Sequence, residues 1–270
     1  MTTLVRDLMH KGLVTCQTNT PLGQVASLLA EHHVHALVVT DESSKPAGII
    51  TDFDLMAGEW LSTDQESLAV MKKLTAGELM SSPIDSVQAD MALPEAARLL
   101  MEKQVYRLLV MEGSEPAGVL SVSDIVASLA RKVKASREIV GDVMSDAFLV
   151  CRDKTPILSI ARTMTEAHWR TVIVVDAQGA PQGVVTAKDL LRFAGNDFDE
   201  NLTVRAVMQE TLTTIDMAAS LQEAANLMIR NHLHRLIVID KDEPDGFPLG
   251  IISSFDIVDE MARPGSVWQV

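Results

Sequence analysis

The stretch Gly48-Ile-Ile-Thr-Asp-Phe-Asp54 carries a pattern that recurs three more times along the 270-residue chain. The pattern is a glycine, two aliphatic residues, a serine or threonine, two variable residues and an aspartate, and its other copies begin at Gly118, Gly183 and Gly250. Such a string is expected by chance only about a few hundredths of a time in a chain of this length and composition. Four copies therefore indicate a duplicated structural unit.

Each copy of the pattern lies in the same sequence context. One methionine stands 28 residues before an aliphatic run in every repeat, and the four methionines are spaced by 71, 64 and 64 residues. These methionines are Met9, Met80, Met144 and Met208, and the runs contain Leu37, Leu108, Val172 and Leu236. The spacing exceeds the roughly 20 to 50 residues of solenoid repeats, so each repeat is predicted to be a small mixed domain.

Within one repeat the residues predict the order strand, helix, strand, strand, helix. A short β-prone stretch follows each methionine, at residues 13–16, 84–87, 148–151 and 212–215. Helix starts are indicated by Thr20-Pro21 and Thr155-Pro156, where a hydroxyl precedes a proline, and by Ser220 with Glu223, which have the spacing of a capping box. The fold class is therefore α/β, more narrowly α+β, with four β-α-β-β-α repeats.

One face of such a small sheet is covered by helices and the other is left apolar, so adjacent repeats are expected to pair. The linkers favour the pairs one with two and three with four. The expected boundaries are repeat one at 1–61, a helical linker at 62–75, repeat two at 76–130, a linker at 131–138, repeat three at 139–196 and repeat four at 197–270.

Composition excludes several classes of protein. A net charge of −14 would repel a phosphate backbone, so nucleic-acid binding is not expected. Apolar runs of four or five residues are far shorter than the roughly 20 that cross a bilayer, and no signal peptide is visible, which favours a cytoplasmic protein without membrane contact. Cys16 and Cys151 fall where the other repeats have Val87 and Ile215, so both are predicted to be buried in strands and not to form a redox pair.

The chain resembles the cystathionine β-synthase (CBS) domain family, whose tandem pairs are called Bateman modules. The resemblance covers nearly the whole chain and is carried by the starts Asp7-Leu-Met9 and Gly141-Asp-Val-Met144, by the run 234–240 and by all four glycine motifs. It implies two Bateman modules that bind AMP, ADP, ATP or S-adenosylmethionine in clefts between paired domains. It also implies a homodimer in which modules form a flat disk.

The motif chemistry suits an adenosine ligand independently of the resemblance. A carboxylate offers two acceptor oxygens to the vicinal hydroxyls of a ribose, which makes ribose ligands of Asp54, Asp124, Asp189 and Asp256. A hydroxyl three residues earlier, at the start of a helix, can hold a phosphate or sugar oxygen, as expected for Thr51, Ser121, Thr186 and Ser253. The same spacing is also that of a plain helix cap, and both roles can hold at once.

Phosphates need cations, and the family resemblance points to basic residues before the second long strand. Arg107 and Arg235 occupy that place, Arg170 lies one position earlier, and Lys188 precedes Asp189 inside its motif. Phosphate binding is therefore expected to be weakest around Asp54, which has Asp52 beside it, and better around Asp189 and Asp256. A solvated or salt-bridged surface role remains the alternative for each arginine.

Three other functions compete with nucleotide sensing. Catalysis is not expected, because no catalytic constellation or phosphate loop stands outside the repeat pattern. Metal sensing would use the histidines at helix ends, but His33, His168 and His232 align with Gln104, which favours a turn role. A ligand-free scaffold that dimerises and regulates an unidentified protein partner is the third. No cofactor is required in any of these interpretations.

Overall fold

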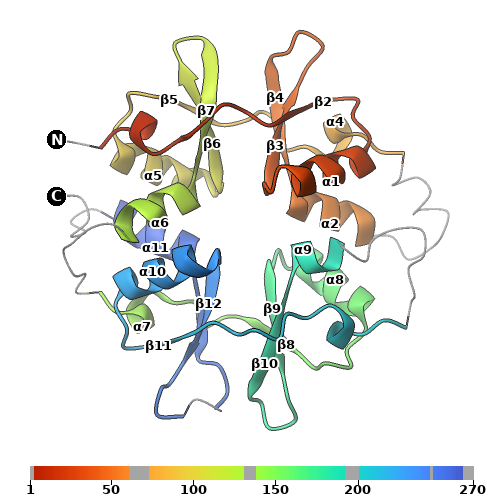
Figure 1. The fold of residues 1–270 in the computed structure, drawn as a ribbon, viewed down its shortest axis with the longest axis vertical. Coiled ribbons are helices and arrows are strands. Elements are labelled where there is room, and N and C mark those ends of the chain that lie inside the picture. The colour runs from red at the N-terminus through yellow and green to blue at the C-terminus, as the bar shows by residue number, and fades with distance from the viewer. Residues whose placement is uncertain (1–2, 61–72, 131–137, 192–200, 244–245, 264–270) are drawn as a thin grey trace. The chain divides into compact units, whose positions relative to one another are not determined.

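The computed structural model describes residues 3–60, 73–130, 138–191, 201–243 and 246–263 (Figure 1). Each repeat contributes three strands to one sheet, in which the first strand runs parallel to the second and the second antiparallel to the third. In repeat two a short strand at residues 10–11 adds a fourth member at the edge of the sheet. One helix connects the first two strands and another follows the third. The predicted β-α-β-β-α order is thus confirmed in all four repeats.

The element bounds are as follows. Repeat one has β2 (Thr15–Gln17), α1 (Leu22–Glu31), β3 (Ala36–Thr40), β4 (Pro46–Thr51) and α2 (Asp52–Trp60). Repeat two has β5 (Ser86–Gln88), α5 (Leu93–Lys103), β6 (Arg107–Glu112), β7 (Glu115–Ser121) and α6 (Val122–Ala130). Repeat three has β8 (Leu149–Cys151), α8 (Ile157–Glu166), β9 (Thr171–Val175), β10 (Pro181–Thr186) and α9 (Ala187–Leu191). Repeat four has β11 (Thr214–Asp216), α10 (Leu221–Asn231), β12 (Arg235–Ile239), β13 (Gly250–Ser253) and α11 (Ser254–Ala262).

The segment that precedes each sheet, here called the arm, lies on the neighbouring repeat and not on its own. The arms are residues 4–12, 75–83, 139–147 and 203–211, and they contain η1 (Val5–Asp7) with β1 (His10–Lys11), α4 (Ala76–Leu79), α7 (Val140–Val143) and η2 (Val204–Ala206). The amide of Val5 donates to the carbonyl of Met91 at 3.0 Å, and that of Ala76 donates to Thr20 at 2.8 Å. Repeats one and two therefore exchange arms reciprocally.

Repeats three and four exchange arms in the same way. The amide of Val140 donates to the carbonyl of Ala219, and that of Val204 donates to Thr155, both at 2.8 Å. The chain accordingly divides into two compact units, one formed by residues 1–12, 85–148 and 213–270 and the other by residues 13–84 and 149–212. It passes from one unit to the other wherever an arm meets its own repeat.

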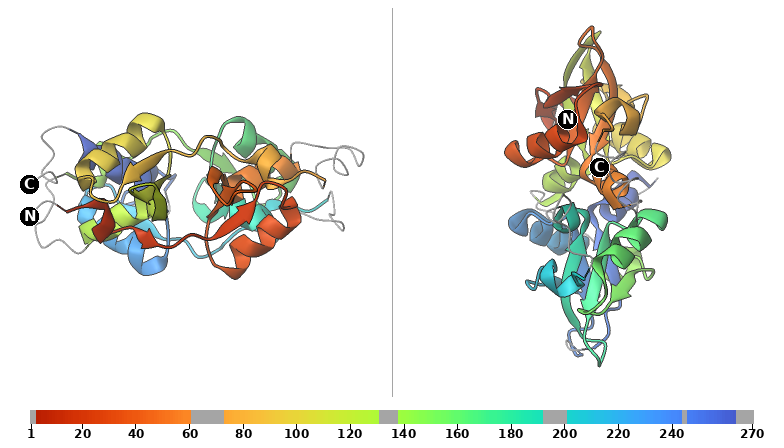
Figure 2. Two further views of the ribbon diagram at one scale, coloured as in Figure 1. Left: turned by 90° about the horizontal axis from the view of Figure 1, so that it is seen from above. Right: turned by 90° about the vertical axis from the view of Figure 1, so that its right-hand side faces the viewer.

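Inside each unit, helices bring alternate repeats into contact. In the first unit α5 packs beside α11 and α6 beside α10, and in the second α2 packs against α8 and α9 (Figures 1 and 2). Met56 of α2 is fully buried among core residues of repeat three. This contact was not predicted, whereas the pairing of sequence neighbours through their sheet faces stays a prediction.

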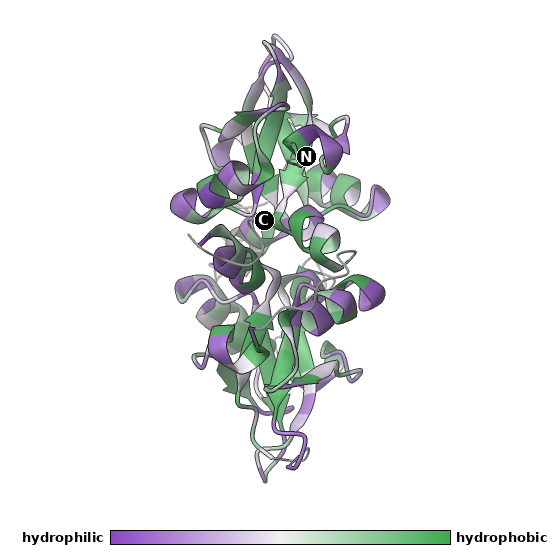
Figure 3. Ribbon diagram, turned by 90° about the vertical axis from the view of Figure 1, so that its left-hand side faces the viewer, coloured by the Kyte–Doolittle hydropathy of each residue, from purple (hydrophilic) through white to green (hydrophobic). Residues whose placement is uncertain are grey.

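The cores form where the sequence places its aliphatic runs. Leu37, Leu108 and Val172 are at most 1% exposed, and Figure 3 shows hydrophobic strands beside helices with hydrophilic outer surfaces. The thiols of Cys16 and Cys151 are free and buried, as predicted, and burial raises the pKa of Cys151 to about 11. Of the predicted helical linker 62–75 only residues 73–75 are described, and they are not helical. Of the linker predicted at 131–138 only residue 138 is described.

At the first helix of each repeat the prediction for the C-terminal end is confirmed, and the threonine caps predicted for the N-terminal start in two repeats are wrong. His33, Gln104, His168 and His232 all adopt positive φ angles between 53° and 56°, which is the turn role expected of them. Thr20 and Thr155 do not cap their helices. Their hydroxyls accept instead from the amides of Gln17 and Arg152 in the preceding turn, because the proline that follows each threonine is itself the N-cap residue.

The Ser220 capping box is present, and its removal should have a measurable effect. The Ser220 hydroxyl accepts from the Glu223 amide at 3.2 Å and donates to the Glu223 carboxylate at 2.9 Å. Ser220→Ala should lower the free energy of unfolding by about 1 kcal/mol, measured by urea denaturation. An unchanged urea midpoint in Ser220→Ala would contradict this assignment.

Candidate functional site

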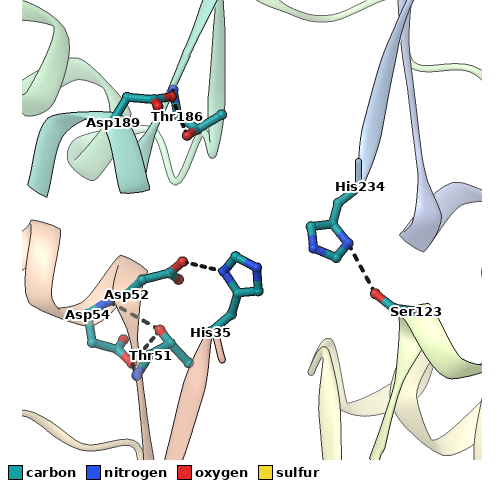
Figure 4. Close-up of polar contacts among 8 residues, drawn as sticks. All are labelled: His35, Thr51, Asp52, Asp54, Ser123, Thr186, Asp189 and His234. Atoms are coloured by element: carbon teal, nitrogen blue, oxygen red, sulfur yellow. Dashed lines mark hydrogen bonds and ion pairs between the residues drawn. The ribbon is translucent and has the colours of Figure 1, made fainter. Parts of the chain in front are cut away.

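Each of the four motif aspartates lies in the first turn of the helix that follows the third strand. The hydroxyl of Thr51 donates to Oδ2 of Asp54 at 2.7 Å, and the amide of Thr51 donates to the same oxygen at 2.8 Å (Figure 4). The other repeats repeat these two bonds, with distances of 2.6 to 2.9 Å, in the pairs Ser121–Asp124, Thr186–Asp189 and Ser253–Asp256. The serine or threonine and the aspartate thus cap the helix and fix the carboxylate.

The helix cap uses only Oδ2 of each aspartate. The four motifs differ in what contacts the other carboxylate oxygen, Oδ1. Oδ1 of Asp124 lies 2.9 Å from Nε2 of His10, and Oδ1 of Asp189 accepts from Nε2 of Gln209 at 2.7 Å. Among the described residues no hydrogen bond reaches Oδ1 of Asp54 or Asp256. In two motifs the protein itself therefore contacts both carboxylate oxygens, and in the other two the described residues leave Oδ1 without a hydrogen bond.

The difference arises from one position in the arm, the residue directly after its methionine. This residue is His10, Ser81, Ser145 or Gln209. In each arm it pairs with the residue that follows the motif glycine: His10 with Val119, Ser81 with Ile49, Ser145 with Ile251 and Gln209 with Val184. The backbone register is the same in all four, so the long side chains of His10 and Gln209 reach a carboxylate that the two serines leave uncontacted.

The contacts between the arm backbone and the third strand also explain the glycine of the motif. A methyl carbon on Gly250 would lie 2.5 Å from the carbonyl oxygen of Ser145, and one on Gly183 would lie 2.8 Å from the carbonyl oxygen of Gln209. The arm backbone therefore passes directly over the glycine, where a side chain would collide with it. The close passage of the arm thus accounts for the glycine in the motif.

Burial and charge also separate the motifs. Asp189 is only 2% exposed, beneath the Gln209 side chain. Burial raises the pKa of Asp54, and the hydrogen bonds of Thr51 and the positive charge of Arg170 offset only part of this effect. Burial likewise raises the pKa of Asp256, with partial compensation from Ser253 and Arg235. These two carboxylates are desolvated without full replacement of the lost water, so additional donors would stabilise their ionised forms.

Contacts between alternate repeats bring further side chains to the motifs. The Arg170 guanidinium of repeat three lies 4.5 Å from the ring centroid of Phe53, next to Asp54 of repeat one. In the other unit the ring of Tyr106 lies 5.1 Å from that of Phe255, next to Asp256. Tyr106 and Arg170 stand at the same place in their repeats, 26 residues after the methionine. Each open motif is thus flanked by a phenylalanine and by a side chain from the repeat across the helix contact.

The other two members of this position behave differently. Nδ1 of His234 lies 3.1 Å from the hydroxyl of Ser123, next to Asp124. His35 instead turns to its own repeat, where its Nδ1 lies 2.8 Å from Oδ2 of Asp52 (Figure 4). In the motifs whose carboxylates are occupied, the residue before the aspartate is Ser123 or Lys188 in place of phenylalanine.

The predicted cations lie in three environments. Arg170 and Arg235 act electrostatically on Asp54 and Asp256, respectively. Arg107 is half-buried at the start of β6, and Lys188 is exposed in α9.

In the described part of the chain no cluster of three His, Cys, Asp or Glu side chains is arranged to hold a metal ion. Within the same residues no helix combines the length and the apolar character that crossing a bilayer requires.

Sequence reasoning missed His10 and Gln209 because both lie in arms, far along the chain from the aspartates they contact. The signal was nevertheless present. Aligning the four repeats on their methionines puts two long polar side chains and two serines at one position, an asymmetry that would have distinguished the motifs had the exchange of arms been known.

The raised pKa of Asp256 predicts a pH-dependent stability difference. Because the folded state binds this proton more tightly than the unfolded state, the wild type should gain stability relative to Asp256→Asn as the pH falls from about 7 towards about 4. Urea denaturation of both proteins across this range measures the difference. A constant difference, or a relative loss for the wild type at lower pH, would contradict the raised pKa.

Comparison with known families identifies the repeats. The CBS domain family profile matches residues 5–58, 76–131, 140–196 and 204–263, and so covers most of the chain. The protein MJ1225 of Methanocaldococcus jannaschii is 21% identical over 262 residues, which cover 88% of this chain and 92% of that protein. The crystal structure of MJ1225 superimposes with a TM-score of 0.84 over 95% of this chain and 99% of that one, at 19% identity, which shows the shared fold.

Two further relatives are longer than the aligned region. An uncharacterized 33.4 kDa protein from a ribosomal RNA operon of Thermofilum pendens is 26% identical over 184 residues, and MJ1404 of M. jannaschii is 26% identical over 191. The matched regions cover 64% and 69% of this chain. They span only 59% of the first relative and 43% of the second.

Proposed function

Because this chain belongs to the CBS domain family, we propose that it is a regulatory protein that binds adenosine-containing ligands, namely AMP, ADP, ATP or S-adenosylmethionine. The ligands bind at the motifs of Asp54 and Asp256, and the bound state is signalled to a separate protein partner. The sequence favoured Asp189 together with Asp256; the occupied Oδ1 of Asp189 moves the proposal to Asp54.

The observation that carries the proposal is the pair of open, desolvated carboxylates. Asp54 and Asp256 each keep Oδ1 free of hydrogen bonds from the described residues, and burial raises the pKa of each. The 2′ and 3′ hydroxyls of a ribose are neutral donors that can reach such a carboxylate together. Their hydrogen bonds would replace the missing water, and bonds to a charged group are among the stronger ones in proteins.

The surroundings of both aspartates suit the rest of a nucleotide. The hydroxyls of Thr51 and Ser253 lie at helix starts, and the guanidinium groups of Arg170 and Arg235 lie near enough to influence the carboxylates. These cations supply local positive charge for phosphates in a protein whose net charge is −14. The neighbouring rings of Phe53 and Phe255 offer apolar surface beside each ribose position.

Signalling requires that ligand binding favour one arrangement of the protein over another. A ligand held between Asp54 of repeat one and Arg170 of repeat three contacts two repeats, so its affinity depends on how they are placed. The same holds for Asp256 of repeat four and Tyr106 of repeat two. We place the response in a homodimeric disk of CBS modules that acts on a partner protein, as the family resemblance implies.

Thermal unfolding with and without AMP tests the proposal. A ligand at 100 times its dissociation constant adds about 2.7 kcal/mol of stability, so millimolar AMP should raise the melting temperature, and ADP, ATP and S-adenosylmethionine are tested beside it. Calorimetric titration should count two AMP molecules per chain. If none of the four compounds changes the melting temperature, the nucleotide proposal fails and a ligand-free scaffold is favoured.

A further inference from the structure

We propose that the arm residue directly after the methionine decides which of the four motifs can accept a ribose. His10 and Gln209, here called the plug residues, act as internal ligands of Asp124 and Asp189, while Ser81 and Ser145 leave Asp54 and Asp256 open. This inference rests on the proposed function, since it concerns the number and identity of its ligand sites.

The geometry of the carboxylates is the first observation that supports this proposal. In all four motifs Oδ2 already accepts an amide and a hydroxyl hydrogen of the serine or threonine. A ribose therefore depends on Oδ1. At Asp189 that oxygen accepts from Gln209 at 2.7 Å, and at Asp124 it lies 2.9 Å from the His10 ring. A ribose can bind there only if it first displaces the plug.

The common backbone register of the four arms is the second observation that supports it. Ser145 and Ile251 exchange two hydrogen bonds of 2.9 and 3.0 Å, and Gln209 and Val184 do the same at 2.9 and 3.0 Å. Residues at this position are thus held identically in front of different motifs, and only side-chain length distinguishes them. The Ser145 hydroxyl donates to the Ala147 carbonyl at 2.9 Å within its own arm.

A charge-assisted hydrogen bond that the ligand must break weakens binding at a plugged motif by about tenfold or more. The plug residue also gives the desolvated carboxylate a hydrogen-bond partner. This matters most for Asp189, because it is the most deeply buried of the four aspartates. The plugged motifs consequently act as helix caps and arm anchors, while the open motifs are the ligand sites.

Calorimetric titration of the full chain with AMP tests the plugs in both directions. Gln209→Ser should add a third AMP site, and that site should vanish again in the double variant Gln209→Ser with Asp189→Ala. Ser145→Gln should remove one of the two wild-type sites. Gln209 is exposed and Ser145 is half-buried, so the melting temperature of each ligand-free variant checks that it folds.

His10 provides a matched control for the chemistry of the plug. His10→Ser should open the motif of Asp124, whereas His10→Gln, which keeps a long side chain with a donor, should leave it closed. If the wild type binds AMP but the number of bound AMP molecules is unchanged in Gln209→Ser, His10→Ser and Ser145→Gln, the role of the plug residues is overturned and the proposed function is kept. Absence of AMP binding in the wild type and in all variants would overturn the proposed function and the plugs together.

Discussion

Alanine at Gly250 is expected to lower the free energy of unfolding by about 3 kcal/mol, a loss typical of an overpacked core site. The added methyl carbon would lie 2.5 Å from the carbonyl oxygen of Ser145 and 3.0 Å from the sulfur of Met144. That carbonyl accepts from the amide of Ile251 at 3.0 Å, so it cannot retreat without breaking the contact between arm and sheet. Guanidinium denaturation of the wild type and of Gly250→Ala measures the loss.

Gly23 provides the matched control for the same substitution. It lies in α1, where no heavy atom lies within 4 Å of an added methyl carbon apart from its chain neighbours and the backbone of its own helix. Gly23→Ala should raise stability by up to about 1 kcal/mol, because alanine is the better helix former. Equal effects at Gly23 and Gly250 would show that the arm does not pass over the motif glycine.

Removal of either open carboxylate is expected to abolish one of the two AMP sites. Asp54→Ala and Asp256→Ala each delete the acceptor of two ribose hydroxyls, and hydrogen bonds to a charged group contribute about 1.5–3 kcal/mol each. The affinity at the altered motif should therefore fall by about 100-fold or more. Calorimetric titration of each variant should count one AMP per chain in place of two.

Asp189→Ala separates loss of a ligand site from loss of a helix cap. This aspartate makes the same two bonds with Thr186 that Asp54 makes with Thr51, so its replacement removes an equivalent cap. The number and affinity of bound AMP should nevertheless stay at wild-type values. A loss of AMP from Asp189→Ala, with full binding kept in Asp54→Ala, would reverse the assignment of open and plugged motifs.

The repeat architecture could be predicted from the sequence because hydrophobic periodicity and a fixed register define each element locally. The strands at Leu37 and Leu108 and the core thiols of Cys16 and Cys151 lie where their patterns placed them. The left-handed turn at Gln104 and its three histidine equivalents also followed from alignment alone. In each case the deciding interactions are made within one repeat.

Features that depend on contacts between repeats could not be predicted. The arms look like the first part of their own repeats, whereas hydrogen bonds such as those of Val5 and Ala76 show that each arm lies on a neighbouring repeat. The carboxylate of Asp189 was favoured as a ligand because Lys188 precedes it, whereas Gln209 from the next arm occupies its free oxygen. Sequence spacing carries no information about such a partner until the exchange is known.

The prediction that Thr20 caps its helix was wrong because a hydroxyl side chain has alternative hydrogen-bond partners nearby. Thr20 and Ser220 both precede a first helix, yet only Ser220 caps it. Proline after Thr20 becomes the N-cap residue itself and leaves the threonine hydroxyl to the preceding turn. Hydroxyl side chains choose between cap and turn according to one neighbouring residue, and propensity alone does not settle that choice.

A crystal structure of the full chain grown with AMP tests the central claim most directly. Ribose density is expected against Oδ1 of Asp54 and Asp256, with His10 and Gln209 still in place on Asp124 and Asp189. Ribose bound at Asp124 or Asp189 in the wild type, or no nucleotide at any of the four carboxylates at millimolar AMP, would contradict it.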